Sequence, residues 1–110
     1  MNNTVMKVDK QALEEQLIAT LKTCYDPEIP VDIFELGLIY EIRIDDDANV
    51  VIKMTLTSPA CPVAGSLPPE VEYKIKGVPG VNSAKVDIVW NPTWDKDMMS
   101  EVAKLELGML

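Results

Sequence analysis

Two neighbouring segments in which apolar and polar residues alternate constrain the fold of this chain most strongly. Residues 38–44 and residues 50–57 each place every second side chain on one apolar face, as half-buried β-strands do. The acidic run 45–49 lies between them and lacks the glycine and the distant glutamate of an EF-hand calcium loop. The sequence therefore predicts an antiparallel hairpin with this solvated run as its turn.

A helix is predicted before the hairpin, over residues 10–24, because its apolar residues fall on one stripe. Asp9 is the expected N-cap, since a carboxylate can accept hydrogen bonds from the free amides of the first turn. Two prolines in the segment 26–30 end this helix, because a residue before proline is pushed toward extended geometry. Residues 31–36 are expected to form one helical turn. The predicted stripe consists of Leu13, Leu17, Ile18, Leu21 and Cys24.

Three further elements are predicted after the hairpin. A helical stretch up to about Lys76 should be broken in its middle by Pro68-Pro69, since proline inside a helix costs about 3 kcal/mol. A third strand is expected over residues 83–90, and a C-terminal helix from about Asp95 to Gly108. The order α, β, β, α, β, α predicts an α+β sandwich, a three-stranded sheet with helices packed on one face. The expected apolar residues of the last helix are Met98, Met99, Val102 and Leu105.

Length and charge limit the classes of function. A chain of 110 residues predicts a single domain over residues 1–110. Its net charge of −8 repels phosphate backbones, which argues against nucleic acid as a partner. The apolar runs are far shorter than a membrane span, and the first residues lack the apolar core of a signal peptide. A cytoplasmic protein without a membrane partner is therefore expected.

The cysteines are the residues with the most distinctive chemistry. Cys61 lies between Pro59 and Pro62, after an apolar strand and before a helical segment, in a chain without any histidine. The usual general base and metal-binding imidazole are therefore missing. Cys24 and Cys61 are better interpreted as thiols than as a structural disulfide in a cytosolic chain. No C-x-x-C pair is present, so the chain alone cannot supply a four-cysteine metal site.

Three separated segments form recognisable motifs. The first combines residues 26–30 (Asp-Pro-Glu-Ile-Pro) with residues 35–40 (Glu-Leu-Gly-Leu-Ile-Tyr), and the second is residues 57–62 (Thr-Ser-Pro-Ala-Cys-Pro). The third is residues 90–94 (Trp-Asn-Pro-Thr-Trp), followed by Met99-Ser100 and Leu107-Gly108-Met109. In this order they resemble the signatures of the SufT/PaaD-like (MIP-type) domain family of iron–sulfur cluster assembly. The match is closest to the stand-alone SufT branch, since the cysteine-rich C-terminal part of the PaaD branch is missing.

The resemblance implies a maturation factor for iron–sulfur proteins that is not an enzyme. It would carry a labile iron–sulfur cluster or assist its transfer, and its partners would be apo client proteins and other assembly components, such as the Suf scaffold and a P-loop carrier ATPase. The chain has no Walker A sequence, so any dependence on nucleotide would come from a partner. A homodimer could supply a second Cys61 to a shared cluster.

Five residues form the predicted site. Pro62 suits the first position of a helix, which would place Cys61 beside free amides that stabilise a thiolate and lower its pKa. Asp26 and Glu28 match the first motif and could complete an iron site or orient a partner. Thr57 and Ser58 could hydrogen-bond a thiolate or sulfide, or only shape the turn.

The other singled-out residues are assigned to the structure of the protein. Cys24 is interpreted as a core thiol, although a disulfide or shared ligation with Cys61 stays open. Trp90 and Trp94 are interpreted as core and lid residues, and an exposed Trp94 would instead indicate a docking surface.

Two alternative functions remain at this point. A cysteine-dependent thiol enzyme would need the helix terminus to activate Cys61, with Asp26 or Glu28 as the base. A metal-free adaptor would bind client proteins through its loops and Trp94.

Overall fold

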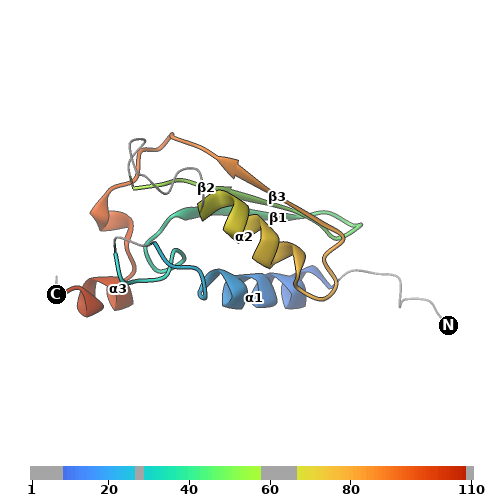
Figure 1. The fold of residues 1–110 in the computed structure, drawn as a ribbon, viewed down its shortest axis with the longest axis horizontal. Helices are drawn as coiled ribbons and strands as arrows, with labels where there is room; N and C mark the ends of the chain where they lie inside the picture. Colours follow the sequence, from blue (N-terminus) through green and yellow to red (C-terminus); the bar gives the residue numbers. More distant parts are fainter. Residues whose placement is uncertain (1–8, 27–28, 58–66, 109–110) are drawn as a thin grey trace.

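The computed structural model describes residues 9–26, 29–57 and 67–108, which form three strands and the helices around them (Figure 1). The sheet has the order β1-β2-β3, with β1 antiparallel to β2 and β2 parallel to β3. The predicted α+β class and element order are confirmed. The elements are α1 (Lys10–Leu21), β1 (Ile39–Ile44), β2 (Asn49–Met54), α2 (Leu67–Lys76), β3 (Ser83–Ile88), the 3₁₀ helix η3 (Lys96–Met98) and α3 (Glu101–Glu106).

The predicted hairpin is present as β1 and β2. Asp45 fixes its turn, because its carboxylate accepts from the amides of Asp47 and Asn49, each at 2.9 Å. These hydrogen bonds, led by those from Asn49, hold the pKa of Asp45 below its usual range. Ala48 completes the turn with a positive φ of 63°. The acidic run is therefore a turn that stabilises its own backbone.

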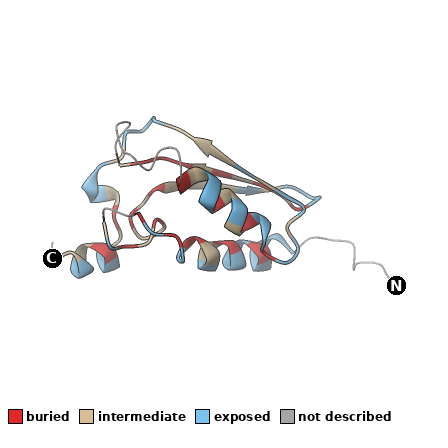
Figure 2. Ribbon diagram, in the orientation of Figure 1, coloured by how far each residue is buried: buried red, intermediate tan, exposed pale blue. Residues whose placement is uncertain are grey.

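The two faces of the sheet differ in chemistry. One face packs on α1 and α2 and carries the aligned row Ile42, Ile52 and Val86. The opposite face carries Glu41, Lys53 and Asp87 in register, and the Lys53 amine lies 3.8 Å from the Glu41 carboxylate. The buried residues lie between the sheet and the two helices in Figure 2. The alternation in the sequence thus specified which face the helices cover.

Helix α1 begins where predicted and ends three residues earlier. The Asp9 carboxylate accepts from the amide of Ala12 at 3.0 Å, which confirms the N-cap. The predicted end at residue 24 is wrong, because the amides of Thr23 and Cys24 donate to carbonyls three residues back and tighten the chain into a turn. Cys24 is nevertheless fully buried.

The predicted break at the prolines is wrong, because Leu67–Lys76 forms one helix, α2. Pro68 and Pro69 lie in its first turn, where a missing backbone amide costs no intrahelical hydrogen bond. The helix buries Leu67, Val71 and Ile75, a stripe at a spacing of four, whereas Tyr73 is 81% exposed. The part of the predicted stretch before Leu67 lies outside the described residues.

The predicted C-terminal helix is two short helices. Met99 has an extended backbone, with φ −65° and ψ 146°, which separates η3 from α3. Ser100 then caps α3, and Gly108 follows it with φ 73°. Val102 and Leu105, expected on an apolar stripe, are exposed. Within the described part of the chain, no helix has the length and apolar character needed to cross a membrane.

Candidate functional site

The candidate site lies at the edge of the sheet where the two parallel strands end. β2 and β3 are parallel, so Met54 and Ile88 pair at the same edge. α2 starts after β2, and residues 58–66, which include Cys61, lie between Thr57 and Leu67 in the sequence. Ligands of open α/β sheets commonly bind beyond the carboxyl ends of parallel strands. Thr57, which follows β2 at this edge, therefore lies in a part of the fold that suits binding.

Backbone hydrogen bonds connect the segment before Asp26 to this edge. The amide of Ile33 donates to Cys24 at 2.8 Å, and the amide of Leu38 donates to Ile33 at 3.1 Å. The amide of Thr55 in turn donates to Leu38 at 2.9 Å. These three hydrogen bonds connect Cys24, at the end of the first predicted helix, to Thr55, which lies two residues before Thr57.

The structure describes two of the five predicted site residues. Asp26 is only 2% exposed and follows Tyr25, which pairs with Asp32 in an isolated antiparallel bridge. Thr57 is partly buried directly after Leu56, which belongs to the core. Both therefore lie on segments that the core holds in place. The other three, Glu28, Ser58 and Cys61, lie outside the described residues.

Two of the sequence motifs pack against each other at this end of the fold. The Trp94 indole donates to the Leu36 carbonyl at 2.8 Å, and the Ser100 amide donates to the Glu35 carbonyl at 2.9 Å. Gly37, with φ +81°, lies so close to Met98 that a Cβ there would overlap its carbonyl group. Trp94 therefore packs against the core, whereas Trp90 is 44% exposed and is not the core residue that was expected.

Tyr40 and Met98 lie next to the candidate site, although the sequence analysis did not include either residue among the predicted site residues. The Tyr40 hydroxyl donates to the Pro92 carbonyl at 2.9 Å and lies 3.4 Å from the Met98 sulfur. Burial raises the pKa of Tyr40, and the Asp95 charge acts in the same direction. Together with Gly37 and Ile39, these residues line a hollow of about 550 Å³. The sequence signal was Tyr40 at the end of the first motif, but its partner lies 58 positions away.

Cys24 is the one cysteine that the structure describes, and its surroundings confirm the core interpretation. Its thiol is buried and lies 3.7 Å from the Thr20 carbonyl, to which it donates. Burial raises the pKa of the Cys24 thiol, although the nearby Lys74 charge partly opposes this. A buried thiol with a raised pKa is a poor nucleophile at neutral pH.

The described residues contain no group of three or more histidine, cysteine, aspartate or glutamate side chains that could hold a metal ion. The predicted metal ligand is Cys61, which is outside that part of the chain.

Comparison with known proteins identifies the class of this protein. The chain belongs to the family described as iron–sulfur cluster assembly protein, whose model matches residues 14–88. It is 46% identical over 110 residues to an Fe-S protein maturation auxiliary factor of Porphyromonas gingivalis, covering 100% of both chains. It is also 43% identical to the auxiliary factor YitW of Bacillus subtilis over 91% of this chain and 98% of that one. The auxiliary factor SufT of Staphylococcus aureus is 42% identical, with coverage of 76% and 96%.

Two solved structures share the fold. A domain of unknown function, DUF59, from Bacillus anthracis superposes with a TM-score of 0.84 at 42% identity, over 98% of this chain and 100% of that chain. A conserved hypothetical protein from Thermotoga maritima gives a TM-score of 0.75 at 38% identity, over 86% and 93%. The two structures confirm the fold, and the family model and the three relatives confirm the family that the motifs indicated.

Proposed function

We propose that this protein is an auxiliary factor for the maturation of iron–sulfur proteins, acts in the cytoplasm and is not itself an enzyme. The observation that carries the proposal is the 46% identity to the Porphyromonas gingivalis auxiliary factor over the full length of both chains. The acidic surface suits protein partners better than nucleic acid.

The proposed partners are apo iron–sulfur clients and other assembly components, including a Suf-type scaffold and a P-loop carrier ATPase. The iron–sulfur cluster carrier protein of Deinococcus radiodurans supports a cluster carrier as a partner. It is 33% identical to 68% of this chain, and the match covers 21% of its own length. A segment similar to this chain is thus part of a longer carrier protein, and we propose that a separate carrier protein is a partner of this one.

Deletion of the gene tests the proposed function. Extracts of the deletion strain should lose activity of iron–sulfur enzymes while matched enzymes without clusters keep theirs, and the wild-type gene should restore the loss. Unchanged iron–sulfur activities under iron limitation and oxidative stress would contradict the proposal.

Within this function, Cys61 is proposed as the reactive thiolate or cluster ligand, with Asp26, Glu28, Thr57 and Ser58 in support. Buried Asp26 and partly buried Thr57 supply two fixed points, the first directly before residues 27–28 and the second directly before residues 58–66, which include Cys61. Cys24 is buried and its pKa is raised, so it does not compete for the same chemistry. One available thiolate per chain is fewer than the four that usually hold a cluster, which favours a labile, shared cluster.

Anaerobic purification with iron and sulfide analysis tests the ligand role. Wild type and Cys24→Ala should carry or reconstitute the same amount of cluster, and Cys61→Ser should carry none. Cluster absorption that survives in Cys61→Ser would remove Cys61 as the ligand. If none of the three proteins holds a cluster, the proposed maturation factor would act on other proteins without binding a cluster itself.

A further inference from the structure

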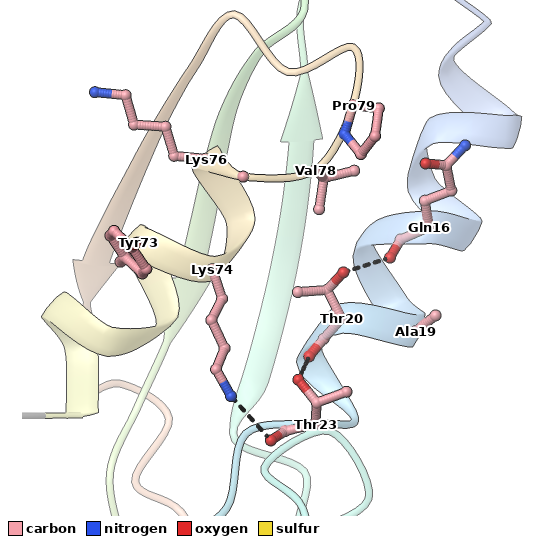
Figure 3. Close-up of a pocket in the computed structure, with 10 residues that line it drawn as sticks. Gln16, Ala19, Thr20, Thr23, Tyr73, Lys74, Lys76, Val78 and Pro79 are labelled. Carbon is pink, nitrogen blue, oxygen red and sulfur yellow. Dashed lines mark hydrogen bonds between the residues drawn. The ribbon is translucent and has the colours of Figure 1, made fainter.

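A groove lies between α1 and α2, and none of the five predicted site residues lines it. It encloses about 680 Å³, and its walls include Ala19 and Thr23 from the α1 side and Val78 and Pro79 after α2 (Figure 3). The two threonine hydroxyls in its wall are already engaged, because Thr20 donates to the Gln16 carbonyl and Thr23 donates to the Thr20 carbonyl. The groove therefore offers an apolar surface in which neither threonine hydroxyl needs a partner from an occupant.

The groove differs in charge from the rest of this acidic protein. Its charged lining residues are Lys74 and Lys76, with no aspartate or glutamate among the described residues that line it, in a chain of net charge −8. The Lys74 amine donates to the Thr23 carbonyl at 3.2 Å and lies 3.6 Å from the Glu70 carboxylate. Lys76 extends from the rim, away from α1 (Figure 3). An occupant with apolar side chains and flanking carboxylates would suit these walls.

Helix α3 carries a surface of this composition. Val102 is 55% exposed and Leu105 is 65% exposed, at a spacing of three that puts them on one helical face. Glu101 and Glu106 lie four positions from Leu105 and Val102, respectively, on the same side and are also exposed. Ala103, on the other side, is buried in the core. The outward face of α3 is thus an apolar pair bordered by two carboxylates.

The two surfaces belong to the same chain but do not meet within it. α3 lies beyond one end of α1, near the C-terminus, and makes no close backbone approach to α1 or α2 (Figure 1). We propose that the groove between α1 and α2 receives α3 of a second copy of this chain. The reciprocal arrangement, in which each copy donates its α3 to the other, closes at two copies and leaves neither surface exposed.

Substitutions at exposed positions test the proposal without disturbing the core. Ala19→Glu introduces bulk and negative charge into the groove, and Leu105→Ser removes half of the apolar pair. Both should loosen the dimer about tenfold or more in sedimentation velocity over a concentration series. Ala12→Glu is the matched control, because it makes the same change at an exposed position of α1 outside the groove and should leave association unchanged. A wild-type monomer at all concentrations, or equal effects of Ala12→Glu and Ala19→Glu, would overturn the proposal.

A photo-crosslinker at position 105 locates the contact. When ¹⁵N-labelled and unlabelled copies of this crosslinker variant are mixed, position 105 of one copy should be joined to residues 16–23 or 73–79 of the other, so that labelled peptides are linked to unlabelled ones. Crosslinks only within one chain, or between copies at other segments, would contradict this interface. Crosslinking in cell extract to an acidic client instead of a second copy would also overturn it and would identify the alternative occupant.

Discussion

Gly37→Ala is the most informative single substitution, because the backbone of Gly37 lies against the backbone of Met98 next to the candidate site. Gly37 has φ +81°, which costs an alanine about 1–2 kcal/mol, partly offset by the lower entropy of the unfolded chain. In addition, a Cβ would overlap the Met98 carbonyl, so the segment from Pro92 to Ser100 must move. The hydrogen bonds from Tyr40 to Pro92 and from Ser100 to Glu35 would then weaken, at about 1 kcal/mol each. The expected total loss is about 3 kcal/mol.

Gly80→Ala is the matched control for this substitution. Gly80 also has a positive φ, +97°, but its Cβ would meet only the Leu13 side chain at an ordinary 3.9 Å. It should lose about 1 kcal/mol, so the difference between the two variants isolates the contact with Met98. Urea unfolding followed by circular dichroism gives both free energies, and a domain with a stability of about 5–15 kcal/mol remains folded in either case. Equal losses would refute the close packing of the first and third motifs.

Four further outcomes are expected. Trp94→Phe should lose about 1–3 kcal/mol in the same unfolding assay, because the buried Leu36 carbonyl loses its donor; a loss near zero would contradict that bond. Tyr40→Phe should remove a component that ionises above the usual tyrosine pKa of 10 from an ultraviolet titration, and persistence of that component would assign it elsewhere. Asp45→Asn should be less stable than wild type at neutral pH. Since the folded protein lowers the pKa of Asp45, this difference in stability should shrink as the pH falls through 3.8 and below. A difference that stays constant would argue against stabilisation of the turn by the charged Asp45 carboxylate. In a Cys61→Ser background, Cys24 should alkylate more slowly than free cysteine until urea unfolds the protein, whereas fast labelling of the folded state would contradict its burial.

Local sequence patterns were sufficient for the elements whose stability is local. The hairpin follows from alternation plus the Asp45 turn, and α1 begins directly after Asp9 because the carboxylate of this N-cap accepts from a first-turn amide. Proline position was harder to interpret, since the same Pro68-Pro69 pair breaks a helix in its middle and suits its first turn. The extended backbone at Met99, which splits the C-terminal helix, accompanies tertiary contacts of Met98 and Ser100 that no local pattern contains.

The candidate site was predictable in its motifs and not in its long-range packing. The motifs led to the family, and the buried Asp26 and Cys24 could be placed near the end of α1. The packing of Tyr40 on Met98 and of Trp94 on Leu36 joins residues 58 positions apart, so it depends on how the whole sheet folds. The assignment of Cys61 stays a prediction from its motif.

The most direct test of the central claim is restoration of iron–sulfur enzyme activity in a strain that lacks this gene. Wild type and Cys24→Ala, produced at equal levels, should restore the activity, because Cys24 is a buried core thiol. Cys61→Ser should be folded and should fail to restore it. Equal restoration by Cys61→Ser would contradict the assignment of Cys61 as the working group, and no restoration by wild type would contradict the maturation function itself.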